Sequence, residues 1–554
     1  MAFNVDQTNP DVHYLVEIVL DTITLRYAEV DLARSDGTLW KGLLIPNTAV
    51  RTSLGSLRDP KYTAASFTIT LDNHDDYIRG LLDQYQVANR AVIVYIGDGA
   101  TSGNYSEWVR GVIRFPGGVS YNQGQATISC DDPRERDALN LPVTRLDPTT
   151  YPNMETKSYY KPMPIVYGDW QTTAGGGEKI PAYQTDSTVG TGGRFHVAGH
   201  CIKAIEAVYK NGASVSFTGD EANGRFTLNV AYAPATDTIT VNCRGATVDA
   251  TTAGTLLENP ALILKDLLKT WLGLADGDLD LTAFTLFQTN TTTSYTCRRW
   301  IGGDRTSSHT LIQELMIESW CDLAIITNKY TPVYRVVADI GTLTNMKDYD
   351  IQKSGSGASA TFTFQVQRDP DRLYCNRAEG QYQYDPVNAT YGKIYSFQDT
   401  AAQADVLTVM ERPTFRFKWL YVTADVQSRV QLEVYVFGSA EVEVLQVTLL
   451  NRSVLLDPTD QFGLIFDKYG VEATAIGAPF QIRSSDRRMG QLMNNIVAWN
   501  MLSLSPGRWT GPAATTWLLS TAYERWSQGY WTDASGFADT GGSPAAASKR
   551  SRWF

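Results

Sequence analysis

The sequence lacks closely spaced cysteines. Six cysteines are spread over 554 residues without a CxxC pair: Cys130, Cys201, Cys243, Cys297, Cys321 and Cys375. A cysteine-cage zinc site or a compact iron–sulfur site needs clustered thiols, so neither is expected, and we predict no bound metal or cofactor. Isolated buried thiols are the favoured interpretation, and they indicate folding in a reducing cytoplasm.

Long hydrophobic runs are also missing. No stretch of about eighteen apolar residues occurs, which predicts no membrane span. The N-terminal segment MAFNVDQTNPDVHYLVEIVL has no basic start, apolar centre and small-residue cleavage site, so we do not expect a secretion signal. No repeat with a period of roughly 20 to 50 residues is visible, which argues against a solenoid.

Positive charge is scarce relative to negative charge. The chain has 48 Lys and Arg against 59 Asp and Glu, a net charge of −11. Binding to nucleic acid without sequence preference depends on cationic contacts to phosphate, so this balance disfavours a protein that grips DNA. It is compatible with a protein that stands beside DNA and repels it.

Catalytic motifs are absent as well. No GxSxG, HExxH, Walker or GxGxxG pattern occurs. His196 and His200 in FHVAGHC could share a metal on a helix, but no carboxylate follows closely, and a packed or surface pair is favoured. Carboxylates are plentiful, yet nothing selects two of them as an acid/base pair. We therefore predict no catalytic residues and no enzymatic activity.

Short β-strand patterns dominate what is present. Residues 14–146 contain YLVEIVL, TITLRYAEV, ASFTITL, RAVIVYIG, WVRGVIRF and QATISC, separated by turn signals. The acidic segment TLDNHDDYIRGLL, residues 70–82, resembles a metal site, but we interpret it as a polar turn followed by a short helix. Asp75 or Asp76 would cap that helix, and Tyr77, Ile78, Leu81 and Leu82 would share one of its faces.

The middle of the chain mixes strands with helices. A Pro- and Gly-rich crossing at 147–192 is followed by strand patterns and an Asn211-Gly212 hairpin turn. ALILKDLLKTWLG begins after a cap at Asn259 and ends at Gly273, while LIQELMIESW follows a capping box formed by Thr310 and Gln313. The strings LAIIT and VYRVVA then predict a hairpin.

Beyond the Gly/Ser-rich break at 354–360, residues 361–503 again favour strands, with one helix from Asp399 to Thr408. RVQLEVYVFGSAEVEVLQVTLL, residues 429–450, alternates valines with polar residues and predicts a long hairpin. Its polar face would carry Glu433, Glu441 and Glu443. An ordinary solvated face explains these three carboxylates equally well.

The last fifty residues have a different composition. They are rich in Gly, Ser, Ala and Thr and have too little apolar content for a core of their own. We expect this segment to be a docking tail, although flexibility is usual at a terminus. The candidate docking residues are Trp509, Trp517, Trp526, Trp531, Trp553 and Phe554.

These patterns predict a β-rich α+β multidomain protein with two β-barrel domains on either side of a mixed α/β middle region. The expected divisions are 1–146 for the first barrel, 147–357 for the middle region, 358–504 for the second barrel and 505–554 for the docking tail.

Several strings resemble, in the same order, segments of the tail-tip or baseplate hub proteins of long-tailed bacteriophages and gene transfer agents. They are TITLRYAEVDL, FTITLDNHDDYIRGLL, YYKPMPIVYGDW, ENPALILKDLLKTWLGL and LIQELMIESWCDLAIIT. The resemblance covers about residues 14–340 and extends more loosely over 414–450. It does not include the segment after about 505.

The resemblance implies a structural virion protein at the distal end of the tail, made in the cytoplasm of a host bacterium. Such hubs are similar to the central baseplate protein of contractile tails. In them, three copies contribute two tail-tube-like barrels each, forming a pseudo-sixfold ring that continues the tail tube. The implied partners are a distal tail protein, a tape measure protein and central or side tail fibre proteins.

The same resemblance implies a channel through which the genome is ejected during host cell entry. Glu433, Glu441 and Glu443 would then line the channel and repel DNA, which passes without specific binding. Two other classes of function stay open: a tail-associated cell-wall hydrolase, and a receptor- or glycan-binding protein that stacks sugars on tryptophans of residues 505–554.

Overall fold

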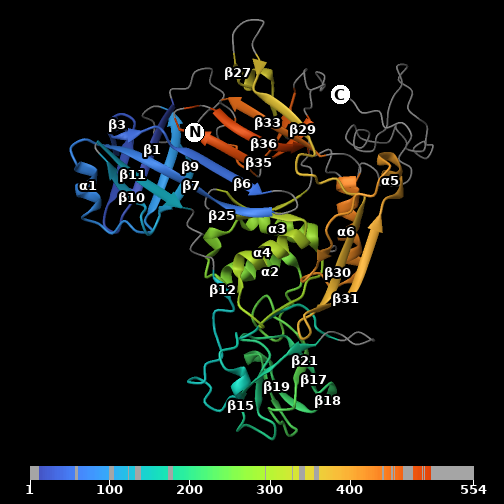
Figure 1. The fold of residues 1–554 in the computed structure, drawn as a ribbon. Coiled ribbons are helices and arrows are strands. Elements are labelled where there is room, and N and C mark those ends of the chain that lie inside the picture. The colour runs from blue at the N-terminus through green and yellow to red at the C-terminus, as the bar shows by residue number, and fades with distance from the viewer. Residues whose placement is uncertain are drawn as a thin grey trace.

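The computed structural model describes residues 12–500 with gaps (Figure 1). The gaps are 56–59, 99–104, 123, 132–138, 172–178, 293–294, 327–328, 336–342, 355–360, 439–441, 451–452, 454–455, 459, 466–477, 490 and 492. No helix among the described residues is both long and apolar enough to span a membrane.

The first β-region, in blue in Figure 1, is a strongly curled sheet with one short helix. Strand pairings run in the order β4–β2–β1–β8–β9–β11–β7, and β5, β6 and β10 pair at the side of β7 or β11. The elements are β1 (Val12–Val19), β2 (Thr24–Ala28), β3 (Leu32–Ala33), β4 (Leu39–Gly42), β5 (Leu44–Ile45), β6 (Ala49–Gly55), β7 (Pro60–Asn73), α1 (Tyr77–Leu82), β8 (Ala91–Asp98), β9 (Tyr105–Ile113), β10 (Val119–Asn122) and β11 (Gly124–Asp131).

This sheet differs from the closed barrel that the sequence predicts. At one end β3 pairs with β4, at the other β5 and β6 pair with β7, and no described ladder joins the two ends. The strand predicted over ASFTITL is confirmed within β7, and its apolar residues alternate, because Phe67, Ile69 and Leu71 are buried in one core with Ile128 of β11. An alternating strand buries every second side chain, and here that face lines the inside of the curl.

The predicted polar turn before α1 is confirmed, but its capping residue is different. Asn73 Oδ1 accepts the backbone N–H groups of Ile78 at 2.9 Å and Arg79 at 3.2 Å. Asp76 stands at the N-cap position with a φ of 55° and makes no side-chain cap. Asp75 Oδ1 accepts the N–H of Tyr77 at 3.1 Å. The segment's polar groups therefore satisfy the free N–H groups of a helix start.

The second β-region, with β33, β35 and β36 in orange to red and β29 in yellow in Figure 1, is a sheet in the order β26–β34–β35–β36–β33–β29. Leu445, Phe462, Phe480 and Ile496 belong to its core. The elements are β26 (Thr344–Met346), a 3-10 turn (Asp348–Asp350), β27 (Lys353–Ser354), β28 (Thr361–Phe362), β29 (Phe364–Arg368), β33 (Glu443–Leu450), β34 (Gln461–Leu464), β35 (Ala478–Arg488) and β36 (Met493–Asn500).

A helical body lies below the two β-regions in Figure 1, and a three-stranded sheet flanks it. One hydrophobic core, whose members lie between Leu141 and Trp499 in the sequence, forms the centre of this helical body. Its elements are β12 (Asn140–Leu141), β13 (Ile165–Tyr167), α2 (Pro260–Asp266), a π-helical turn (Leu267–Trp271), a 3-10 turn (Asp276–Asp278), α3 (Leu281–Thr291), β22 (Arg299–Ile301), β23 (Thr306–Ser307), α4 (Ser308–Glu318), β24 (Cys321–Ile326), β25 (Lys329–Tyr334), β30 (Arg377–Asp385), β31 (Thr390–Gln398), α5 (Thr400–Val406), β32 (Phe415–Arg416) and α6 (Thr423–Gly438).

A small β-module occupies the bottom of Figure 1 and consists of two four-stranded sheets, β14–β21–β17–β18 and β15–β16–β20–β19. The predicted Asn-Gly turn is confirmed between β17 and β18, with φ of 51° at Asn211 and 84° at Gly212. The elements are β14 (Ile180–Pro181), β15 (Tyr183–Asp186), β16 (Arg194–His196), β17 (Ala204–Lys210), β18 (Ala213–Val215), β19 (Phe217–Asp220), β20 (Arg225–Leu228), β21 (Ile239–Arg244) and 3-10 turns at Thr156–Ser158 and Glu221–Asn223.

The expected helices of the body are present with small differences. Asn259 Oδ1 accepts the N–H of Ala261 at 2.9 Å, which confirms the predicted cap of α2. Helix α4 begins at Ser308 after an N-cap at Ser307, so Thr310 does not cap it as predicted. The predicted hairpin that follows is present as β24 and β25, but its second strand begins at Lys329, ahead of the predicted VYRVVA string, and ends at Tyr334.

The prediction of a hairpin over residues 429–450 is wrong. Residues 423–438 form helix α6, and only Glu443–Leu450 is a strand, β33. Val430, Val434 and Phe437 are fully buried at helical spacing. The valine alternation fits a strand as well as a helix face, and packing on β30 and β31 selects the helix.

Packing also groups the chain differently from the expected ranges. Residues 373–442 were expected in the second barrel, but Leu373, Phe417, Val430 and Val442 belong to the core of the helical body. The second β-region is therefore built from residues 343–368 and 443–500, with the intervening segment packed elsewhere.

Candidate functional site

The two β-regions are joined edge to edge through β6 and β35. These strands pair antiparallel from Ser53 opposite Ser484 to Ala49 opposite Arg488. Strand β7 occupies the other edge of β6, and β36 occupies the other edge of β35. Met489, which follows β35, is 2% exposed and belongs to the core of the first β-region. One sheet therefore runs from one β-region into the other, and their relative position is fixed by backbone hydrogen bonds.

A buried ionic cluster lies where this joint meets the helical body. Asp322 of β24 accepts hydrogen bonds from Arg335 at 3.0 and 2.9 Å and from Arg483 of β35 at 2.6 Å. Arg483 also donates to the carbonyl of Leu54 in β6 at 3.2 Å. The three charged side chains are each no more than 3% exposed. The cluster thus connects elements of the first β-region, the second β-region and the body.

The protonation of the cluster follows from its geometry. Burial by itself would raise the pKa of Asp322, but the adjacent Arg335 and Arg483 outweigh burial and lower that pKa to about 2. Burial lowers the pKa of the Arg483 guanidinium. The Leu54 carbonyl adds a further acceptor for the Arg483 guanidinium, so this buried cation is hydrogen-bonded by both the carboxylate and the backbone.

Glu433, predicted on a channel wall, lies instead inside the helical body. Its side chain is 0% exposed, and it forms ion pairs with Arg412 and, at 2.9 Å, with Arg429. Arg429 also donates to the carbonyl of Ile317 in α4 at 3.3 Å. Because Glu433 falls on the buried face of α6 and is paired there, it cannot face a channel.

Glu318, at the end of α4, is another buried carboxylate of the body. Its carboxylate oxygens accept the backbone N–H groups of Lys418, Trp419 and Leu420, each at 2.9 Å. Burial raises its pKa to about 7, although these three donors act in the opposite direction. The contact holds segment 418–420 against α4, and no motif in the sequence identifies this residue.

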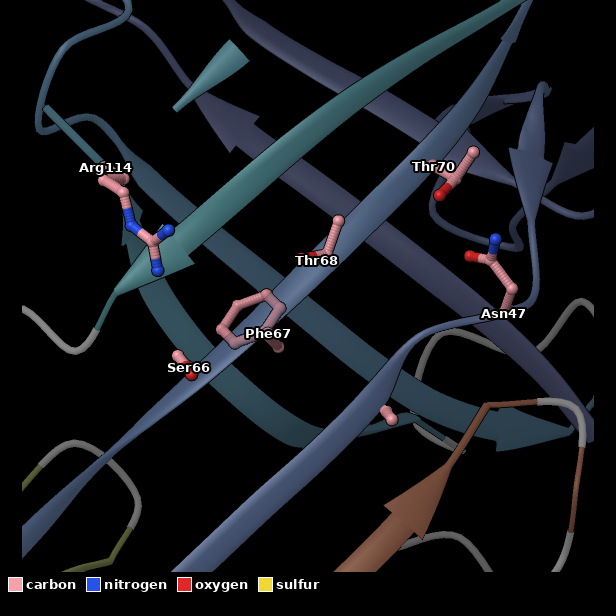
Figure 2. A pocket seen from close by; sticks show the side chains of 7 residues that line it. Asn47, Ser66, Phe67, Thr68, Thr70 and Arg114 are labelled. Carbon is pink, nitrogen blue, oxygen red and sulfur yellow. The ribbon is translucent and has the colours of Figure 1, made fainter. Parts of the chain in front are cut away.

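A shallow cavity of about 310 Å³ lies on the first β-region (Figure 2). Figure 2 shows its side chains arranged along β7 and on the segment between β5 and β6, with Arg114 at one end. The Arg114 guanidinium forms an ion pair with Asp131 at 2.6 Å. The remaining lining is uncharged, so the cavity presents no set of groups for acid/base chemistry. Its lining residues are Asn47, Ala49, Ser66, Phe67, Thr68, Thr70 and Arg114.

The two histidines that could have shared a metal have separate partners. His196 Nδ1 lies 2.9 Å from the hydroxyl of Thr185, and burial lowers the His196 pKa to about 4. His200 Nε2 accepts the N–H of Val166 at 3.0 Å, while its Nδ1 donates to the carbonyl of Cys201. In the described part of the chain, no group of three potential metal ligands occurs.

The other predicted site residues are only partly described. Glu443 begins β33, where Asn500 donates to its Oε2 at 3.0 Å and Arg368 approaches its Oε1 at 3.9 Å. Glu441 lies outside the described residues, as do Trp509, Trp517, Trp526, Trp531, Trp553 and Phe554.

Comparisons with known proteins give low similarity. No family model matches the sequence, and no curated protein matches it. The structure is similar to the 43 kDa tail protein of prophage MuSo2 from Shewanella oneidensis, with 9% identity, a TM-score of 0.39, and coverage of 89% of this chain and 99% of that one. It is also similar to prophage tail protein gp18 from Listeria monocytogenes EGD-e, with 7% identity, a TM-score of 0.37, and coverage of 88% and 94%.

A third similar structure is a chain in the virion of a native gene transfer agent particle. The identity is 12%, the TM-score is 0.36, and the match covers 68% of this chain and 91% of that chain. Identities and TM-scores this low transfer no property of those proteins to this chain.

Proposed function

We propose that this chain is a structural hub protein at the distal end of a bacteriophage-type tail, in the tail tip or baseplate. The observation that carries the proposal is the edge-to-edge joint of two β-regions within one chain, through β6 and β35. The ordered sequence resemblance described above supports the same function. A hub of this kind acts by holding other tail proteins in position, and the proposal includes no chemical reaction.

Three copies of such a chain would supply six β-regions around one axis. A tail tube with sixfold symmetry needs six similar docking surfaces, and a homotrimer with two β-regions per chain meets that need. Figure 1 shows the two β-regions next to each other, with the helical body and the small β-module on one side of them. In a ring, the β-regions would face the tube, and the body and module would extend away from it.

The ring would surround a channel for genome ejection. The net charge of −11 disfavours adhesion of DNA to the wall. Of the three carboxylates first considered for this wall, Glu433 is excluded by its burial. Glu443, at the start of β33, is still proposed to line the channel wall, because its side chain is only partly buried. Glu441 stays with it as a prediction.

The partners of this hub would be a distal tail protein, a tape measure protein and central or side tail fibre proteins. A trimer offers six β-region surfaces to a hexameric neighbour and three repeated surfaces to fibres. The segment 505–554 is the proposed contact for one of these partners or for the chain itself.

The decisive test is the mass and location of the full-length protein. Native mass spectrometry should give three times the subunit mass of 61.3 kDa, either alone or after addition of tail tubes. Electron microscopy of particles that carry a labelled copy should place the label at the distal tail end. A chain that stays monomeric with tubes present, or a label elsewhere on the particle, would refute the hub.

A further inference from the structure

Four large hydrophobic side chains are exposed within five consecutive residues at the end of α5. Val406, Leu407, Val409 and Met410 are 41%, 89%, 52% and 44% exposed. No other window of five described residues holds more than two exposed large hydrophobic side chains. Single exposed hydrophobic residues are ordinary, but a contiguous group indicates a surface that something covers. We call residues 406–410 the apolar strip.

Leu407 has an unfavourable backbone as well as an exposed side chain. Its φ is 56°, in the left-handed region that suits glycine or asparagine and penalises a branched hydrocarbon side chain. Within the described residues, the side chain gains almost no burial that would offset this cost. A contact with a further segment would supply the missing burial.

The apolar strip is held in a defined position. Asn376, which is fully buried, donates from its side chain to the carbonyl of Thr408 at 2.9 Å. The same side chain accepts the N–H of Met410 at 2.8 Å, and the backbone N–H of Asn376 donates to the Met410 carbonyl at 2.9 Å. Three hydrogen bonds to one buried residue make the strip a preformed platform, which lowers the entropic cost of binding.

A series of contacts leads from the last described residue, Asn500, to this platform. Asn500, the last residue of β36, donates to Glu443, which is paired with Arg368 across the ladder of β33 and β29. The next residue, Asp369, donates to the Val442 carbonyl at 2.7 Å, and its side chain accepts the N–H of Tyr374 at 2.9 Å. Residues 368–376 thus connect the neighbourhood of Asn500 to Asn376 and the strip.

We propose that segment 505–554 of the same chain docks on the apolar strip. An extended chain covers about 3.3 Å per residue, so a few residues after Asn500 give ample reach. Tryptophans provide large apolar faces, and the thioether of Met410 packs well on aromatic rings. The segment is too rich in small and polar residues to bury its own tryptophans. This inference does not depend on the hub function.

A photo-crosslinking experiment on the full-length chain tests the proposal. p-Benzoylphenylalanine replaces Val409, and in a control it replaces Leu39, which is 74% exposed on the first β-region. The protein is irradiated, and the product with the size of a monomer is isolated. Mass spectrometry of this product should find crosslinks from position 409 to peptides within 505–554. Crosslinks from position 39 should not involve those peptides. The yield should not change when the protein is diluted, because the contact lies within one chain.

A second variant separates docking from folding. Leu407→Gly removes the exposed side chain and suits the positive φ, so the fold should be preserved. In this background, the crosslink yield from position 409 to residues 505–554 should fall by about tenfold, the loss expected when one large apolar contact is removed.

Three results would overturn the proposal. The first is the absence of peptides from 505–554 in the crosslinks at position 409. The second is a crosslink to those peptides that disappears on dilution, which would assign the strip to a second copy. The third is a yield that Leu407→Gly leaves unchanged, because the leucine would then contribute no contact.

Discussion

Asp322 has two guanidinium partners inside the protein, and its side chain is only 1% exposed. At the scale of single residues, such a buried group is sensitive to the loss of one partner, because the remaining charges keep their desolvation cost. Sequence alone did not identify it. Arg483 is distant in the chain from Asp322 and Arg335, and no spacing motif connects the three residues.

Removal of Arg483 should therefore destabilise the protein strongly. Arg483→Ala leaves Asp322 with Arg335 alone and removes a donor from the Leu54 carbonyl. We expect a loss of about 3–5 kcal/mol in the free energy of unfolding, measured by urea denaturation near pH 7. Arg51→Ala is the control, because Arg51 pairs with Asp486 at 3.3 Å but is 73% exposed, and its loss should stay below about 1 kcal/mol. Equal losses would contradict the prediction.

Glu318 should make stability depend on pH in the opposite sense from a surface carboxylate. Burial raises its pKa from 4.5 to about 7, so between these values the folded state binds a proton that the unfolded state has released. Stability should be complete below the lower value and decrease as pH rises through about 7, by at most about 3 kcal/mol. Free energies of unfolding measured from pH 4 to pH 8 test the slope.

The matched variants are Glu318→Gln and Glu411→Gln. Glu318→Gln has no titrating group at this position, so the decrease should be lost. The Glu411 side chain is 46% exposed, and its substitution should leave the decrease as in the unmodified protein. A decrease that persists in Glu318→Gln would assign it to another group.

At the scale of elements, β30 and α6 are in close contact at Gly380. A Cβ at this position would lie 2.5 Å from a ring carbon of Phe417 and 2.9 Å from a methyl group of Val430 in α6. The absence of a side chain at Gly380 is therefore what allows this helix to approach the sheet. The sequence shows a glycine there without showing what it faces.

Gly380→Ala should destabilise the protein by about 1–3 kcal/mol through overpacking. Gly80→Ala in α1 is the matched change, because no atom lies within 4 Å of its added Cβ. That substitution should be stabilising by roughly 0.5–1 kcal/mol, the helix preference of alanine over glycine. Thermal and urea unfolding of both variants provide the measurement. A neutral Gly380→Ala would mean that α6 does not pack on β30 as described.

Most helices and strands could be predicted from local sequence patterns. The wrong prediction for α6 arose where one local pattern fits both a strand and a helix. The β7 alternation, the Asn211-Gly212 turn and the Asn259 cap depend on neighbours in the chain, so they were predictable. Helix α6 was not, because apolar residues at 430, 432, 434 and 436 satisfy a strand pattern, while Val430, Val434 and Phe437 satisfy a helical one. Only the surface against which they pack distinguishes the two.

At the scale of the whole molecule, the joint between β6 and β35 makes the two β-regions depend on each other. Strand β6 is paired on both edges, with β7 and with β35. A missing N–H in β6 therefore breaks a ladder whichever way it points, and the change should reach the second β-region through the shared sheet.

Thr52→Pro should increase hydrogen exchange in β6 and β35 together, each by more than about tenfold, which corresponds to ~1.4 kcal/mol of local opening. Thr52→Ala keeps the N–H and should leave exchange nearly unchanged, so the pair separates a backbone effect from a side-chain effect. Acceleration in β6 with β35 unchanged would show that the β-regions open independently.

Residue types and local patterns are enough to predict the β-rich composition, most of the short strands, the helix that begins at the Asn259 cap and the excess negative charge. These properties depend on residue type and on neighbours within a few positions. The tertiary structure alone decided that Glu433 is buried between two arginines, that residues 373–442 pack with the helical body, and that β6 pairs with β35. Each of these depends on which distant surface a segment meets, because burial and strand pairing are properties of two partners, and a single stretch of sequence specifies only one of them.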